Sequence, residues 1–242
     1  MKASLMITCL GDMFFPDVGV AMVKLLRRLG VNVDFPDGQT CCGMPLFNSG
    51  YHDDARAVAE RTVRLFAGAL HVVVPSGSCA WMVKAEYPGL LTHDPALHAQ
   101  AVALANKTYE LSQFLVHVLN VTDVGSDFRG RVTYHDSCHL LRGLGESRAP
   151  RALLGGVKGC ELVELPDSDE CCGFGGSFSV RLPEVSTAIL DKKLANAEST
   201  GADCLVACDA GCLMQIGGRL SRRGSRLRAL HLAQVLAPEG SP

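Results

Sequence analysis

Cys171-Cys172-Gly173 repeats, 130 residues later, the triplet Cys41-Cys42-Gly43. Each pair of adjacent cysteines also has one single cysteine upstream and another downstream. These flanking residues are Cys9 and Cys79 for the first pair, and Cys138 and Cys212 for the second. The pattern C…CC-G…C is therefore written twice, with offsets of 129, 130, 130 and 133 residues between the copies. In a chain of 242 residues, this duplication predicts two similar domains of ordinary size.

The overall composition limits the class of protein. A hydrophobic content of 48% and a charged content of 20% are typical of a compact globular chain. The net charge of −2 gives no reason to expect nucleic acid as a partner. No stretch approaches 18 apolar residues, and the first apolar run is too short for a signal peptide, so we expect a soluble, cytoplasmic protein that is not integral to a membrane. Eleven cysteines in a reducing compartment favour metal or redox chemistry over disulfides.

Short apolar runs alternate with stretches of helical periodicity in both halves. We expect strands at residues 4–8, 31–35 and 71–74, and again at 131–134, 161–165 and 204–207. Helices are expected between them, for example over residues 18–29, 53–66 and 183–200. This order predicts an α/β fold with two similar tandem domains, each a mostly parallel sheet covered by helices, related by pseudo-two-fold symmetry. The predicted domains are residues 1–122 and 131–242, with a linker at 122–130.

The cysteines of the repeat lie just beyond the ends of predicted strands. The carboxyl ends of parallel strands share one edge of a sheet, so cysteines that are distant in sequence can converge there. Glycine accepts a positive φ, and Gly43 and Gly173 would let both members of each pair turn toward one centre. We therefore expect two quartets at these edges: Cys9, Cys41, Cys42 and Cys79, and Cys138, Cys171, Cys172 and Cys212.

Four thiolates suit either a tetrahedral zinc ion or an iron–sulfur cluster. Structural zinc sites commonly use paired C-x₂₋₄-C knuckles, and no such pair recurs in both halves. Widely separated single ligands with one adjacent pair favour an iron–sulfur cluster. Zinc and metal-free thiol redox chemistry stay open as alternatives.

Three cysteines fall outside the repeat. Cys160 and Cys204 lie at strand starts, and we assign them to packing. Cys208 is four residues before Cys212 at a strand end, which leaves open a role as an extra ligand. His135 and His139 flank Cys138 and are candidates for N–H···S hydrogen bonds or proton relay, with ordinary buried histidines as the alternative.

The duplicated pattern resembles a known family. With Tyr134-His135-Asp136-Ser137-Cys138-His139 opening its second copy, the chain resembles the cysteine-rich CCG-domain family, which includes iron–sulfur subunits of glycolate oxidase and heterodisulfide reductase. The two-domain length, the lack of a C-x₂-C-x₂-C segment and the stretch CLMQIGG at 212–218 make it most similar to the lactate-utilisation branch of that family. The resemblance extends from Cys9 almost to the end of the chain.

This resemblance implies an iron–sulfur electron-transfer subunit that works with two partner subunits in oxidising L-lactate to pyruvate. Electrons would pass to an acceptor such as a quinone or a carrier. The resemblance also implies that the two quartets are the cluster ligands. Heterodisulfide reductase subunits end the motif in C-x-x-C, whereas Met82 and Gln215 stand at the last position here, so we expect one four-ligand cluster of the [4Fe-4S] type in each domain.

No catalytic residue can be named from the sequence, which contains neither a P-loop nor a dinucleotide fingerprint. The chain is therefore expected to be a non-autonomous subunit of an oxidoreductase complex. Two alternatives stay open, a thiol–disulfide reductase subunit of the heterodisulfide type and a zinc-stabilised scaffold protein.

Overall fold

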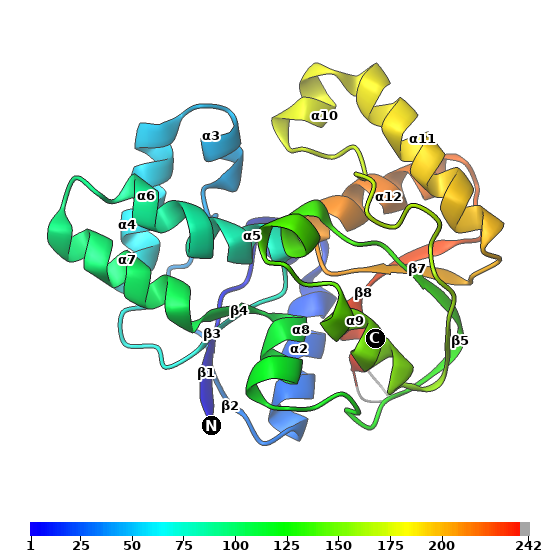
Figure 1. Ribbon diagram of the computed structural model, residues 1–242, viewed down its shortest axis with the longest axis horizontal. Coiled ribbons are helices and arrows are strands. Elements are labelled where there is room, and N and C mark those ends of the chain that lie inside the picture. Colours follow the sequence, from blue (N-terminus) through cyan, green and yellow to red (C-terminus); the bar gives the residue numbers. More distant parts are fainter. Residues whose placement is uncertain (238–242) are drawn as a thin grey trace.

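The computed structural model describes residues 1–237 and contains two four-stranded sheets whose strand pairs are all parallel (Figure 1). The first sheet has the order β2-β1-β3-β4 and the second the equivalent order β6-β5-β7-β8. The strands are β1 (Lys2–Leu5), β2 (Asn32–Asp34), β3 (Val72–Val74), β4 (Thr108–Glu110), β5 (Asp127–Tyr134), β6 (Lys158–Leu162), β7 (Cys204–Ala207) and β8 (Arg228–His231). The expected α/β fold with two similar halves is confirmed.

Helices cover both sheets, and the first half has more of them than the second. The first half contains α1 (Cys9–Phe14), α2 (Pro16–Arg28), α3 (Met44–Asn48), α4 (His52–Leu65), α5 (Gly77–Trp81), α6 (Tyr87–Leu90), α7 (Pro95–Lys107) and α8 (Leu111–Gln113). The second contains α9 (Arg148–Gly155), α10 (Ser177–Arg181), α11 (Pro183–Ser199), α12 (Ala210–Arg222) and α13 (Leu232–Leu236). Three π-helical turns complete the chain: η1 (Met82–Glu86), η2 (Phe114–Val118) and η3 (His139–Gly143). Within residues 1–237, no helix has both the length and the apolar character needed to cross a bilayer.

Several boundaries differ from those expected from sequence. Strand β6 lies at Lys158–Leu162, three residues before the predicted run at 161–165. Strand β5 begins at Asp127, so its first residues occupy part of the segment expected to be a linker. The two edge strands β4 and β8 were not predicted. The domain division at 122 and 131 stays a prediction, and residues 238–242 of the predicted second domain lie outside the described residues.

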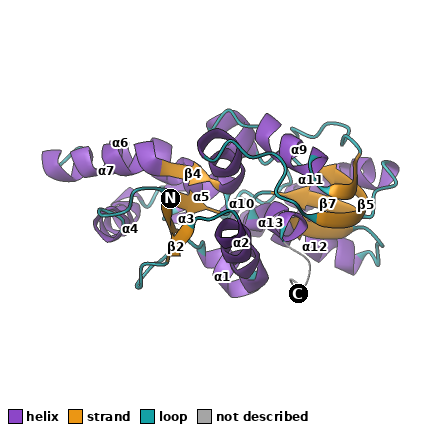
Figure 2. Cartoon of the chain, turned by 90° about the horizontal axis from the view of Figure 1, so that it is seen from below, coloured by secondary structure: helices purple, strands orange, loops and turns teal. Residues whose placement is uncertain are grey.

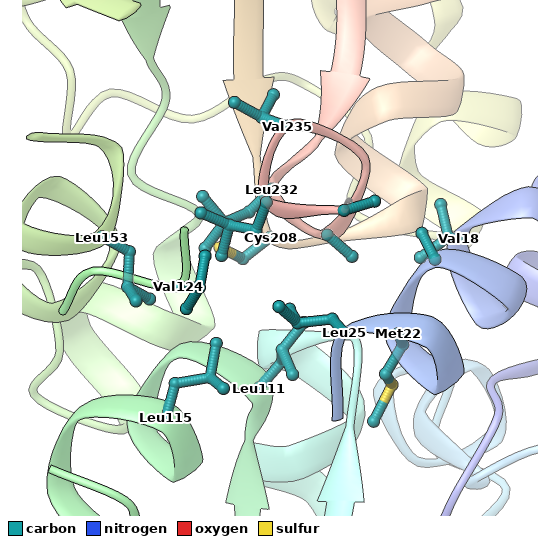
Figure 3. Packing of buried hydrophobic residues seen from close by; sticks show 14 of the residues in the cluster. Val18, Met22, Leu25, Leu111, Leu115, Val124, Leu153, Cys208, Leu232 and Val235 are labelled. Atoms are coloured by element: carbon teal, nitrogen blue, oxygen red, sulfur yellow. The ribbon is translucent and has the colours of Figure 1, made fainter. Parts of the chain in front are cut away.

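One hydrophobic cluster is shared by the two halves, and each half also has a cluster of its own. Helix α2 of the first half packs against α13 of the second, and Figure 2 shows both helices between the two groups of strands. Leu25 of α2 lies close to Leu111 of α8, with Leu232 at the start of α13 on the other side of the same cluster (Figure 3). All three side chains are fully buried. Because burial of apolar area is the main source of folding stability, each half depends on the other.

Equivalent buried caps begin α8 and α13, and the cap of α13 also links the halves. His231 begins α13: its Nδ1 accepts a hydrogen bond from the Ala233 N–H at 3.0 Å, so Nε2 carries the proton and donates to the Pro75 carbonyl of the first half at 3.1 Å. Burial lowers the pKa of His231 to about 4, which keeps the ring neutral. Glu110 holds the equivalent position before α8, where it accepts the Ser112 N–H at 2.7 Å. Burial raises the pKa of Glu110 to about 7.

We predict that Glu110→Gln removes a loss of stability that the wild-type protein shows as the pH rises from 4.5 through about 7. The folded-state pKa of Glu110, about 7, lies above its ordinary value of 4.5, so its contribution is fully present below pH 4.5 and is lost as pH rises through 7. Urea unfolding should show the variant gaining up to about 3 kcal/mol over the wild-type protein between pH 5 and pH 9. Both proteins contain the same cysteines, so the effect of cysteine titration cancels in the difference between their free energies of unfolding at each pH. A stability difference that is independent of pH would contradict the buried, protonated carboxyl.

Candidate metal centre

All eight cysteines of the repeat line one cavity of about 290 Å³. The cavity lies where the carboxyl ends of the two sheets meet, so both quartets face the same space. Helices α3 and α10 approach its rim from opposite halves, and the hydroxyls of Ser49 and Ser177 lie 3.2 Å apart there (Figure 1). The sequence predicted two groups of sulfurs but gave no signal that they would share a cavity.

Two sulfur pairs form the first quartet. Cys9 begins α1, and its Sγ lies 3.6 Å from that of Cys41. The Sγ atoms of Cys42 and Cys79 are 3.2 Å apart. Cys41 also accepts the Gly43 N–H at 3.4 Å. Hydrogen bonds from the thiols of Cys42 and Cys9 lower the pKa of Cys41 to about 3, and the pKa values of those two donors are raised in turn.

The second quartet repeats this arrangement. The Sγ atoms of Cys172 and Cys212 are 3.2 Å apart, and Cys171 accepts the Gly173 N–H at 3.2 Å. Hydrogen bonds from the thiols of Cys138 and Cys172 lower the pKa of Cys171 to about 2. In each half the pKa of one cysteine, Cys41 or Cys171, is therefore lowered by the thiols that donate to it. A metal requires deprotonated sulfur, so binding at either quartet would release protons.

The turns of the two CCG triplets differ in how tightly they are packed. Gly43 and Gly173 have φ values of +86° and +82°, as expected from the sequence. A Cβ at Gly43 would lie 3.5 Å from the Ala55 carbonyl oxygen, whereas one at Gly173 would lie 2.4 Å from that of Ser186. The Ser186 hydroxyl also donates to the Gly173 carbonyl at 2.7 Å. Gln215 donates to the Ser186 hydroxyl at 2.8 Å and so supports the second turn from α12.

Asp209 joins the two halves at the cavity. It precedes α12, and one carboxylate oxygen accepts the Ser78 N–H at 2.9 Å, the Ser78 hydroxyl at 2.6 Å and the Ser76 hydroxyl at 3.0 Å. The other oxygen accepts the Gly211 N–H at 3.0 Å. These bonds connect the helices that carry Cys79 and Cys212. Sequence reasoning missed Asp209, although an aspartate directly before a helix is a recognisable N-cap.

The two candidate histidines occupy different environments. The His139 ring lies 5.0 Å from the Trp81 ring of the first half, and its Nδ1 is 3.7 Å from the Cys138 Sγ. His135 is only 1% exposed. A ring nitrogen of His135 and the sulfurs of Cys172 and Cys212 all lie within 4.8 Å of one another. Burial lowers the pKa of His135 to about 4, which leaves a neutral imidazole.

The three cysteines outside the repeat do not line the cavity. Cys208 lies within the shared core, where its sulfur accepts the Tyr134 hydroxyl at 3.3 Å (Figure 3). Cys204 is buried in β7 and accepts from Arg228 at 3.2 Å. Cys160 lies on the edge strand β6. This placement agrees with packing roles for Cys160 and Cys204, and it separates Cys208 from both quartets.

Two segments of the chain, residues 4–84 and 132–217, match the model of the CCG cysteine-rich domain. These segments are the two copies of the cysteine pattern, and together they cover most of the chain. The protein belongs to the CCG cysteine-rich domain family.

Curated members of the CCG family cover nearly the whole chain. It is 53% identical over 236 residues to the lactate utilization protein A of Geobacillus thermodenitrificans, covering 98% of each chain. It is 52% identical to the lactate utilization protein A of Halalkalibacterium halodurans, covering 98% of this chain and 96% of the relative. A crystal structure of a hypothetical protein from Helicobacter pylori shares the fold, with a TM-score of 0.64, 12% identity, and coverage of 97% of this chain and 48% of that one.

The donor set of this CCG protein suits a sulfur-ligated metal group. Each quartet offers four cysteines that are free of disulfides, and one sulfur in each, that of Cys41 or Cys171, accepts a backbone N–H. Such N–H···S bonds stabilise anionic sulfur around iron–sulfur clusters. The inner sulfurs Cys42, Cys79, Cys172 and Cys212 are buried, while the cavity gives access to the outer ones. The residues present therefore fit an iron–sulfur cluster in each half.

We predict that Gly173→Ala is more damaging than Gly43→Ala. Both changes place a side chain at positive φ, which costs about 1 kcal/mol. Only the change at Gly173 also forces a Cβ against a backbone carbonyl, that of Ser186, and overpacking of this kind adds about 1–3 kcal/mol. Urea unfolding of the two variants measures the difference, each serving as the control for the other. Equal losses of stability would show that the second turn is no tighter than the first.

Proposed function

We propose that this chain is the iron–sulfur electron-transfer subunit of a cytoplasmic system that oxidises L-lactate to pyruvate. The observation that carries the proposal is the gathering of eight repeat cysteines around one cavity in a member of the CCG family. Its relatives named lactate utilization protein A supply the metabolic context. The proposed ligands are Cys9, Cys41, Cys42 and Cys79 for one [4Fe-4S] cluster, and Cys138, Cys171, Cys172 and Cys212 for the other.

A bound cluster would supply one-electron chemistry. The chain itself contributes the surroundings that set the cluster's reduction potential. The N–H groups of Gly43 and Gly173 donate to sulfur. Two of the four cysteines in each quartet are buried, which limits the contact of their sulfurs with water. The thiols of Cys9 and Cys138 would lose their protons to solvent through the cavity as a cluster binds.

Oxidation of a hydroxy acid is a two-electron reaction that also removes protons. The sequence carries no nucleotide-binding fingerprint that would place a hydride acceptor in this chain. We therefore propose that it acts with two further subunits, one of which begins the oxidation, and that it passes electrons to a quinone or another carrier. The chain alone is not expected to turn over L-lactate.

We predict that protein purified without oxygen contains iron and acid-labile sulfide, with roughly eight iron atoms per chain for two [4Fe-4S] clusters. Cys42→Ala and Cys172→Ala should each remove about half of the iron, because each removes a buried ligand from one quartet. Cys160→Ala is the matched control, since Cys160 does not line the cavity and should leave the iron content unchanged. Iron and sulfide assays and EPR spectra of the reduced protein measure these results.

The same measurements decide between the proposal and its alternatives. Zinc fits the group formed by His135, Cys172 and Cys212, and a zinc-stabilised scaffold would contain zinc without sulfide or an EPR signal. A thiol–disulfide reductase would draw on the low pKa of the exposed Cys171 and would reduce disulfides without iron. Either result would replace the electron-transfer proposal.

We also predict a growth defect that is specific to L-lactate. A strain lacking the gene should fail to grow on L-lactate and should grow normally on pyruvate, because the block lies before pyruvate. The gene carrying Cys160→Ala should restore growth on L-lactate, while the gene carrying Cys172→Ala should not. Growth measured as doubling time on each carbon source gives the comparison. Full rescue by the Cys172→Ala gene would exclude the second quartet from the process.

A further inference from the structure

His135 and Met6 hold equivalent positions in the two halves. Each is the first residue after the central strand of its sheet, β5 or β1. The His135 N–H donates to the Val206 carbonyl of β7 at 2.9 Å, and the Met6 N–H donates to the Val73 carbonyl of β3 at 3.0 Å. Both side chains are buried, with exposures of 1% and 3%. The duplication therefore places an imidazole beside the second quartet where the first has a thioether.

The His135 ring has no hydrogen-bond partner at either nitrogen within residues 1–237. A buried polar group without a partner costs free energy, so such groups normally find one. One ring nitrogen of His135 and the sulfurs of Cys172 and Cys212 all lie within 4.8 Å of one another, close enough to hold a single metal ion. His135 does not line the cavity, so it reaches these sulfurs from their buried side.

The polar groups around His135 are committed to other partners. Lys193 donates its Nζ to the backbone carbonyls of Asp167 and Ser168. Asp136 pairs with Arg151 through two bonds of 2.8 and 2.7 Å. Asp209 accepts from the first half as described above. None of these side chains forms a hydrogen bond with the imidazole. A metal ion between the ring and the two sulfurs would therefore give the free nitrogen lone pair a partner.

We propose that His135 is a nitrogen ligand of the metal centre in the second half, together with Cys172 and Cys212. This inference rests on the metal centre proposed above. Because each iron of a [4Fe-4S] cluster takes one terminal ligand, His135 would stand in place of one of the outer cysteines, Cys138 or Cys171. The two centres then differ in kind. The first is held by sulfur alone, and the second has a mixed nitrogen and sulfur donor set.

Two features of the ring suit this role. A metal needs a nitrogen lone pair that no hydrogen bond uses, and neither ring nitrogen of His135 has a hydrogen-bond partner within residues 1–237. Imidazole is an uncharged ligand, so it adds less negative charge to a centre than a thiolate does. Replacing thiolate by imidazole at an iron–sulfur centre raises its reduction potential. The second centre would therefore hold an electron more readily than an all-sulfur centre in the same surroundings.

The test uses protein labelled with [¹⁵N]histidine, purified without oxygen and reduced, and examined by pulsed EPR. The wild-type chain should show a ¹⁵N coupling of the strength typical of a nitrogen bound to iron. His135→Met copies the residue that the first half accommodates at the same place, and it should lose this coupling while the cysteine quartet keeps its iron. His139→Gln is the matched control, because His139 lies beside Cys138, and it should retain the coupling.

Three results would overturn the proposal: no ¹⁵N coupling in iron-loaded wild-type protein, only the weak coupling of a hydrogen-bonded N–H, or a strong coupling that survives His135→Met. The wild-type spectrum decides even if the variant does not fold. If the chain binds no iron, the proposed function fails, and Co²⁺ added to the metal-free protein tests the ligand separately. His135→Met should then shift the visible Co²⁺ bands relative to His139→Gln, and identical bands would exclude nitrogen ligation.

Discussion

The site depends on one constraint, that the carboxyl ends of two parallel sheets face each other across a short distance. Within one sheet, parallel strands bring their carboxyl ends to a common edge, and this alone gathers four cysteines from distant parts of a half. The second gathering step needs the shared core, in which α2 and α13 pack together. Without that packing, each quartet would lie at an open sheet edge, and the cavity lined by all eight cysteines would not exist.

The duplication has kept the donors and changed what supports them. In the second half, the CCG turn is held by hydrogen bonds through Ser186 and Gln215. The corresponding places in the first half are taken by the apolar residues Ala55 and Met82. The loop before Cys138 is also held by the Asp136–Arg151 pair, which has no charged counterpart at Ile7. Polar support of this kind is directional, so it restrains the second quartet more than apolar contacts restrain the first. Equal cysteine spacing therefore does not imply equal sites.

Sequence patterns predicted the elements whose side chains are buried in a regular way. The runs that became β3 and β7 are wholly buried, and the periodic apolar face of α2 points into the core. The edge strands β4 and β8 were not predicted. Each is short and has a charged residue at one end, Glu110 or Arg228, so neither contains a clear apolar run. Strand β6 was misplaced for a similar reason, since it contains no long apolar run.

The candidate site was predictable in its sulfurs and unpredictable in its other members. Cysteine spacing pointed to all eight cysteines that line the cavity, because a repeat is visible without any coordinates. The joint cavity and the role of Asp209 depend on how the two sheets meet, which no local pattern encodes. Short backbone contacts determine how closely the two sheets approach each other.

The Gly77 N–H donates to the Cys208 carbonyl at 3.1 Å, and a Cβ at Gly77 would lie 2.8 Å from the Leu140 side chain. Apolar packing is non-directional and tolerates small rotations, whereas a backbone hydrogen bond at a position that accepts only glycine does not. The distance between the two quartets is therefore set by main-chain atoms of both halves.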